Sequence, residues 1–203
     1  MHCTLIYNPA SGVAHARREE QVLQAAAVLS AGGNSVEIIS TSCSGSATAQ
    51  TREAVANGAE VVFACGGDGT IHEVVQGLIC ESGEAAGALG IIPLGSANAL
   101  ARHLGLSLDP CKAARQQLNG ARRRIPAGVL RQGERTRYFV LMAGAGPDGA
   151  LAYRLPRGSK ATIGRFAYYS QAARLFLTTR FRPFTVHYRG TGSRFLVLSR
   201  QWV

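Results

Sequence analysis

The chain has 203 residues and a formal net charge of +10, and 46% of its residues are hydrophobic and 17% charged. This composition is typical of one large globular domain, or of one domain plus part of another, and it excludes a disordered chain. The strongest apolar stretches, residues 61–65 and 89–94, are too short to span a bilayer. The chain opens on a strand-like run without a basic leader, so we expect a cytoplasmic protein.

The charge is divided unevenly along the chain. Residues 1–120 carry a net charge of −4, whereas residues 121–203 carry +14. A segment with such an excess binds nucleic acid, an anionic membrane or a phosphorylated ligand, or is simply a solvated basic surface. No RNA-binding or helix-turn-helix pattern is present, which favours peripheral association with the inner membrane surface over nucleic acid.

The first 120 residues alternate between strand and helix patterns. Apolar residues recur at a helical spacing within residues 17–29, and residues 61–65 are wholly apolar, as in a buried parallel strand. We predict strands at 3–7, 36–39, 61–65 and 89–93, with helices at 17–29, 47–56, 71–78 and 97–104. This alternation predicts an α/β fold: a doubly wound parallel-sheet nucleotide-binding domain over residues 1–122.

Residues 123–203 have a different pattern. Four β-rich runs, at 125–130, 138–142, 184–188 and 195–198, lie close together, and one helical segment, 166–177, interrupts them. Short strands separated by turn residues predict part of an antiparallel β-sandwich domain. Four strands leave an open edge, so we expect this second domain to be incomplete.

The strongest chemical signal is the run Gly66-Gly67-Asp68-Gly69-Thr70, directly after the apolar strand and before a helix. Glycines let a backbone approach phosphate oxygens closely, and the following helix N-terminus favours negative charge. A carboxylate in such a loop suits a Mg²⁺ ligand or an acceptor for the proton of an attacking hydroxyl. The alternative is a tight turn in which Asp68 caps the helix.

Two further loops follow predicted strands with similar residues: 8–12 and 93–98, each with a glycine, a hydroxyl and an Asn amide. Because the carboxyl ends of parallel strands meet at one edge of a sheet, the three loops together predict a composite phosphate site. The sequence contains no GxxxxGK[ST] motif and no GxGxxG after the first strand, so it predicts neither a P-loop nor a dinucleotide fingerprint.

These motifs, in this order and at these separations, resemble the catalytic domain of the diacylglycerol kinase family, which includes bacterial lipid kinases and the sphingosine and ceramide kinases. The resemblance rests on Asn8-Pro9-x-Ser11-Gly12, Thr41, Gly66-Gly67-Asp68-Gly69-Thr70-x-x-Glu73 and Gly95-Ser96-x-Asn98. It implies ATP and Mg²⁺ as cofactors and transfer of the γ-phosphoryl group to the hydroxyl of diacylglycerol or a similar lipid alcohol. It implies Asp68 as the catalytic residue. The implied nucleotide-binding residues are Asn8, Pro9, Ser11, Gly12, Thr41, Gly66, Gly67, Asp68, Gly69, Thr70, Glu73, Gly95, Ser96 and Asn98.

The metal ligands remain unassigned. The resemblance implies that family members continue beyond the position of Val203, where they supply acidic Mg²⁺ ligands, so we expect a C-terminally truncated chain. Two alternatives stay open: an NAD kinase-like nucleotide kinase, and a truncated, non-catalytic nucleotide- or membrane-binding protein. The expected partner is a lipid substrate at an anionic phospholipid surface, and a homodimer is also considered. His72 is either a catalytic base or, as we expect, a polar residue facing solvent or phosphate.

Overall fold

The structure is a computed structural model that describes residues 1–11, 17–80 and 82–144. The chain divides into two units, Met1–Met142 and Ala143–Val203, and the helices and strands described below lie in the first. The predicted boundary at residue 122 stays a prediction. The predicted helix 166–177 and the strands 184–188 and 195–198 lie outside the described residues.

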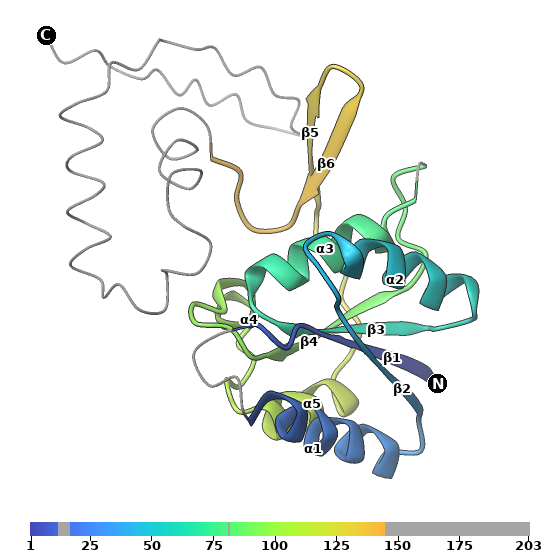
Figure 1. Cartoon of the computed structure of the whole chain (residues 1–203), viewed down its shortest axis with the longest axis vertical. Coiled ribbons are helices and arrows are strands. Elements are labelled where there is room, and N and C mark those ends of the chain that lie inside the picture. The colour runs from blue at the N-terminus through green and yellow to red at the C-terminus, as the bar shows by residue number, and fades with distance from the viewer. Residues whose placement is uncertain (12–16, 81, 145–203) are drawn as a thin grey trace, which may run out of the picture. The chain divides into compact units, whose positions relative to one another are not determined.

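Four parallel strands form the central sheet, in the order β2-β1-β3-β4 (Figure 1). They are β1 (His2–Tyr7), β2 (Ser35–Ser40), β3 (Val61–Gly66) and β4 (Ala88–Pro93). β3 is buried along its whole length, as its unbroken apolar sequence predicts, because both of its faces are covered. The predicted parallel sheet is confirmed.

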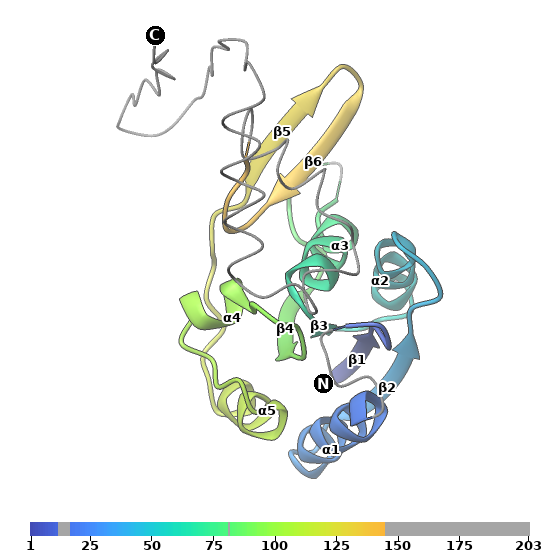
Figure 2. The ribbon, with the colours of Figure 1, turned by 60° about the vertical axis from the view of Figure 1, so that its left-hand side comes forward.

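Helices cover both faces of this sheet (Figures 1 and 2). Val62 and Ala64 pack on the side of α2 (Ser46–Ala56) and α3 (Asp68–Leu78). Phe63 and Cys65 pack on the side of α1 (Arg18–Ala31) and α5 (Pro110–Leu118). Successive residues of a strand point to opposite faces, so one apolar strand supplies two cores. The doubly wound architecture is therefore confirmed.

The two helices after β4 differ from the sequence prediction. α4 (Ala99–His103) is shorter than the predicted helix 97–104, because Asn98 has a left-handed backbone with φ of 48° and cannot be part of it. α5 was not predicted. Its sequence signal is an N-cap aspartate followed by proline: Asp109 accepts a hydrogen bond from the Lys112 backbone N–H at 2.8 Å, and Pro110 begins the helix.

An antiparallel hairpin follows α5 and is formed by β5 (Gly128–Gln132) and β6 (Arg135–Phe139). It confirms an antiparallel element after residue 123, although β5 begins later than the predicted strand 125–130. Pro126 explains that shift in part, because proline has no N–H to donate to a ladder. None of the described helices has the length and apolar character needed to cross a bilayer.

Candidate functional site

The loops that carry the predicted motifs lie side by side at the carboxyl edge of the sheet. Backbone hydrogen bonds continue the strand pairing past the strand ends: Asn8 N–H donates to Cys65 O at 3.2 Å, and Leu94 N–H to Gly66 O at 2.9 Å. Thr41 N–H donates to Tyr7 O at 2.8 Å. The strand order thus places four segments in one row: Thr41 after β2, the loop from Asn8 after β1, the loop from Gly66 after β3 and the loop containing Gly95 after β4.

Glycines at this edge allow backbones to touch. A Cβ added to Gly95 would clash with the Gly67 Cα, and one added to Gly67 would lie 3.2 Å from the Gly95 Cα. A Cβ on Gly66 would clash with the Thr70 hydroxyl and lie 3.0 Å from Ser11 Oγ. Ser11 and Thr70 are both buried, at 8% and 5% exposure. The loops after β1, β3 and β4 therefore pack as one unit.

The N-terminus of α3 is open to a ligand. Gly67 occupies the N-cap position and has no side chain to accept from the first-turn N–H groups. Gly69, in that first turn, is exposed, has no positive φ, and would place an added Cβ in open space. Neither packing nor backbone conformation therefore requires a glycine at this position. Close approach by a phosphate does require one, and the helix dipole favours the negative charge of a phosphate.

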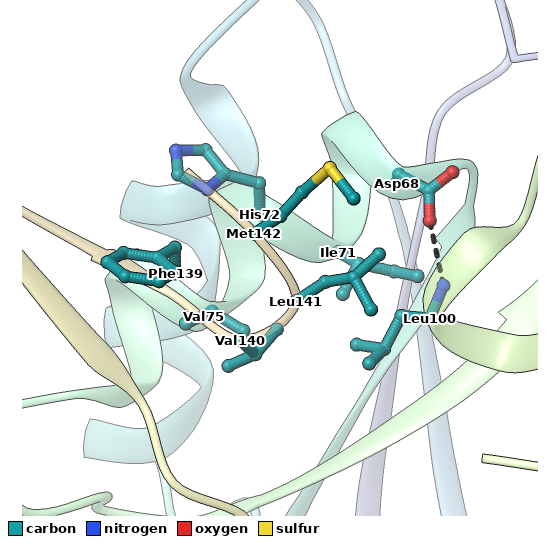
Figure 3. A pocket seen from close by; sticks show the side chains of 9 residues that line it. All are labelled: Asp68, Ile71, His72, Val75, Leu100, Phe139, Val140, Leu141 and Met142. Atoms are coloured by element: carbon teal, nitrogen blue, oxygen red, sulfur yellow. Dashed lines mark hydrogen bonds between the residues drawn. The ribbon is translucent and has the colours of Figure 1, made fainter. Parts of the chain in front are cut away.

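Asp68 is the first residue of α3, and its carboxylate links two loops. Oδ1 accepts a hydrogen bond from the Leu100 backbone N–H at 3.2 Å, at the start of α4 (Figure 3). Oδ2 forms no hydrogen bond with the described part of the chain. The side chain is therefore held in place by one oxygen, while the other remains free to meet a ligand, a metal ion or a proton.

A hollow of about 170 Å³ opens beside Asp68; we call it the α3 hollow (Figure 3). Among the described residues that line it, most are apolar, and Asp68 and His72 are the polar members. This volume is below the roughly 300–1,000 Å³ of a complete small-molecule pocket, so it accommodates only part of a ligand. The lining residues are Asp68, Ile71, His72, Val75, Leu100, Phe139, Val140, Leu141 and Met142.

His72 lines this hollow from one helical turn beyond Asp68. Burial lowers the pKa of the imidazole; Arg137 lowers it further and Glu73 opposes the change. The neutral form is therefore favoured. No hydrogen bond joins His72 to Asp68, and the two side chains lie toward opposite ends of the view in Figure 3. His72 lines the apolar hollow and is also exposed to solvent, so its burial is only partial.

Besides Asp68, three of the predicted nucleotide-binding side chains have partners inside the protein. Asn8 Oδ1 accepts from Ala10 N–H at 2.8 Å and closes the first loop. The Asn98 amide pairs with Gly95, accepting from its N–H at 2.9 Å and donating to its O at 2.8 Å. Glu73 Oε2 accepts from Ala47 N–H at 3.3 Å, in the first turn of α2. These side chains shape the loops of the site, and direct contact with a nucleotide stays a prediction.

Among the other predicted residues, Ser96 and Pro9 are exposed on their loops and Thr41 is half-buried. Gly12 lies outside the described residues. Residues 1–11, 17–80 and 82–144 contain no cluster of three or more His, Cys, Asp or Glu side chains that could hold a metal ion. Asp68 alone still suits Mg²⁺, which kinases commonly bind through one or two carboxylates together with substrate phosphates and water.

Sequence reasoning missed Arg18, in the first turn of α1 at the same edge of the sheet. Its side chain is 7% exposed, and its Nε has no hydrogen-bond partner in the described structure. Nη1 donates to Gln21 Oε1 at 3.4 Å, and burial lowers the pKa of the guanidinium. A buried cation that has no carboxylate partner among the described residues suits an anionic ligand. Its signal in the sequence was an Arg pair beginning a helix after a phosphate loop.

An α/β sheet with glycine loops packed at its carboxyl edge defines a nucleotide-binding type of domain. The family model described as the diacylglycerol kinase catalytic domain matches residues 2–130, and the chain belongs to this family. It is 35% identical to a diacylglycerol kinase of Bacillus subtilis (strain 168) over 188 residues, which are 92% of this chain and 59% of the relative.

A second relative, the "Probable lipid kinase YegS-like" protein of Chromohalobacter salexigens, is 40% identical over 117 residues, covering 58% of this chain and 36% of the relative. A solved structure described as "a putative diacylglycerol kinase from Bacillus anthracis str. Sterne" matches with a TM-score of 0.50 and 28% identity. That match covers 59% of this chain and 42% of the solved one. The chain spans about half the length of the curated relatives that it matches.

Proposed function

We propose that this chain binds ATP with Mg²⁺ at the carboxyl edge of the sheet and acts in transfer of the γ-phosphoryl group to a lipid alcohol such as diacylglycerol. The observation that carries the proposal is the open N-terminus of α3, where Gly69 leaves space that the fold does not use. Family membership and the names of the relatives support a lipid kinase. The neighbouring buried Arg18 adds positive charge for the phosphates.

The chemistry assigned to Asp68 follows from its two oxygens. Oδ1 is fixed by Leu100, and Oδ2 is the atom that would accept the proton of the attacking hydroxyl or hold Mg²⁺. When the alcohol oxygen bonds to the γ-phosphorus, the bond from that phosphorus to the β–γ bridging oxygen breaks and ADP leaves. Bound Mg²⁺ would neutralise phosphate charge. The α3 hollow, with a carboxylate beside apolar walls, suits the alcohol-bearing end of a lipid.

The nucleotide site is tested with Gly69→Ala. An added Cβ meets no protein atom, and alanine favours helix over glycine by up to about 1 kcal/mol, so the free energy of unfolding should not fall. Because the methyl group would occupy the space of a phosphate, calorimetry with ATP and Mg²⁺ should show at least about tenfold weaker binding, or about 1.4 kcal/mol. Unchanged ATP affinity would contradict the assigned site.

The reaction is tested with Asp68→Asn, which keeps an oxygen to accept from Leu100 N–H but removes the charge and the proton acceptor. We expect transfer to fall by about 100-fold or more. The assay separates the radiolabelled products of γ-labelled ATP with diacylglycerol, ceramide or NAD. A labelled lipid supports the proposal, whereas a labelled NAD product favours an NAD kinase-like enzyme. ATP binding with no product from any acceptor favours the non-catalytic alternative.

We also propose that the basic segment, residues 121–203, docks on anionic membranes. Within the described residues, six arginines of this segment are exposed: Arg122, Arg123, Arg124, Arg131, Arg135 and Arg137. Each basic residue near an anionic surface contributes roughly 1 kcal/mol, and salt screens it beyond a Debye length of about 8 Å. Sedimentation with phosphatidylglycerol liposomes should therefore show binding that weakens at high salt. Equal binding to neutral liposomes would contradict this. The predicted homodimer is tested by sedimentation velocity.

A further inference from the structure

The helix that begins at Asp68 also holds the opposite wall of the α3 hollow, through the side chain of Gln76. Gln76 is buried, at 6% exposure, and both ends of its amide bond the backbone of Tyr138 in β6. Oε1 accepts from Tyr138 N–H at 3.0 Å, and Nε2 donates to Tyr138 O at 2.8 Å. Nε2 also donates to His72 O, one turn back, at 3.3 Å. The side chain thus pairs with β6 as a neighbouring strand would.

The position of this pairing gives it a consequence for the hollow. Phe139, Val140, Leu141 and Met142 follow Tyr138 directly, and all four line the hollow. The facing wall is formed by Ile71, His72 and Val75 of α3, which carries Gln76 as well (Figure 3). Leu141 and Met142 are 38% and 74% exposed, so burial alone holds them weakly. Gln76 is therefore a direct polar link between the two walls.

We propose that Gln76 is a positioning residue that determines acceptor specificity: by fixing Tyr138, it sets the gap between α3 and residues 139–142, and so the width open to the lipid alcohol. This inference rests on the proposed function, because it takes the α3 hollow as the acceptor site. Gln76 itself contacts neither nucleotide nor acceptor. It acts through the backbone of the wall, so its loss should affect recognition of the acceptor and leave ATP binding nearly unchanged.

The chain offers a closely matched control in Gln117 of α5. Its Oε1 accepts from Ile91 N–H and its Nε2 donates to Ile91 O, both at 2.8 Å, and Nε2 also donates to Ala113 O one turn back, at 2.9 Å. These are the same three kinds of hydrogen bond. They join a helix to β4, a strand of the sheet, and Gln117 does not line the hollow. Gln76→Met and Gln117→Met therefore remove the same three kinds of hydrogen bond from different places, one from a buried side chain and one from a half-buried side chain.

The experiment measures steady-state kinetics of the full chain with ATP and with diacylglycerols of short and long acyl chains, presented in detergent micelles. For Gln76→Met we expect the KM for diacylglycerol to rise about fivefold to tenfold, because a wall held by fewer hydrogen bonds spends less time in the position that binds the acceptor. The preference between short and long chains should change as well. The KM for ATP should stay within about twofold. For Gln117→Met we expect unchanged values of both constants and of the preference. If the melting temperature falls in both variants but the kinetic constants change only in Gln76→Met, lost stability does not explain the kinetic change.

Hydrogen exchange supplies a second measurement that does not depend on turnover. Amides of residues 138–142 should exchange faster in Gln76→Met than in the parent, and unchanged in Gln117→Met. If Gln76→Met does not fold, Gln76→Glu, which keeps one acceptor for Tyr138 N–H, takes its place. Unaltered exchange in Gln76→Met, or equal kinetic changes in the two variants, overturns the inference about Gln76. The proposed function still stands in that case if the parent chain phosphorylates the lipid alcohol. A parent that binds ATP but phosphorylates no lipid alcohol overturns both.

Discussion

The loops at the carboxyl edge of the sheet and those at its amino edge both contain glycines, but for different physical reasons. At the carboxyl edge, Gly67 and Gly95 have no positive φ, and an added Cβ would meet another backbone. At the amino edge, Gly33 and Gly58 have φ of 79° and 89°, with open space around them. The first pair provides close approach between loops, and the second pair provides a left-handed turn.

This difference separates the part of the fold that serves a ligand from the part that only reverses the chain. A left-handed turn needs one residue that tolerates a positive φ, and the packing of neighbouring residues does not depend on it. Contact between two loops requires both glycines at once, because each backbone occupies the space of the other's missing Cβ. Substitutions should therefore affect the two edges differently, in nucleotide binding as well as in stability.

The largest effect is expected from Gly95→Ala. Its Cβ would clash with Gly67 and lie 2.8 Å from Asn98 Oδ1, so the loops after β3 and β4 must separate. We expect a loss of roughly 1–3 kcal/mol in the free energy of unfolding, as for other overpacked sites, and ATP binding below detection. Urea unfolding and calorimetry measure these quantities. Wild-type ATP affinity in this variant would mean that contact between the loops is not needed for the site.

Arg18→Met should separate binding from stability at the same edge. Methionine keeps the apolar stem of the side chain and removes a buried guanidinium whose Nε lacks a partner in the described structure. The free energy of unfolding should stay the same or rise, because an unpaired buried polar group is costly. ATP affinity should fall about tenfold, or about 1.4 kcal/mol. A stability loss without an affinity change would assign Arg18 to the fold alone.

Gly58→Ala tests the amino edge. A non-glycine residue in the left-handed region costs about 1–2 kcal/mol, so the variant should unfold at lower urea concentration. Because the turn lies at the opposite end of the strands from the candidate site, ATP affinity should match that of the parent. A drop in affinity comparable to that of Gly95→Ala would break the distinction between the two edges.

The smallest expected effect concerns pH. Partial burial and Arg137 lower the pKa of His72 in the folded state. As pH falls, the imidazole of the unfolded chain is therefore protonated first, near its ordinary pKa of about 6.5. The contribution of His72 is therefore fully present above that pH and is lost as pH falls through the lower folded pKa. His72→Gln should show a shallower fall of unfolding free energy between about pH 7 and pH 5 in urea titrations. His72 and His103 are both exposed, so His103→Gln is the control for losing an exposed imidazole that does not line the hollow.

Much of this architecture was determined by the sequence alone. The apolar run of β3 and the alternation of strands with helices predicted the parallel sheet and its two covered faces. An unbroken apolar run is typical of a strand buried on both faces, and a helix between two strands is the usual connection between parallel strands. The same rule placed the loops after β1, β3 and β4 at one edge. α5 could have been predicted as well, since Asp109-Pro110 is a local signal for the start of a helix.

Only the tertiary structure decided what the individual side chains of the site do. Asn8, Asn98 and Glu73 have the residue types of nucleotide ligands, but each has a partner within the fold. The Arg pair after the first phosphate loop is visible in the sequence, but the burial of Arg18 and its unpartnered Nε within the described residues are seen only in the structure. The pairing of Gln76 with Tyr138 joins residues 62 positions apart, and no spacing rule could predict it. Hydrogen-bond partners depend on which segments meet in space, and that outcome is set by packing of the whole sheet and its helices.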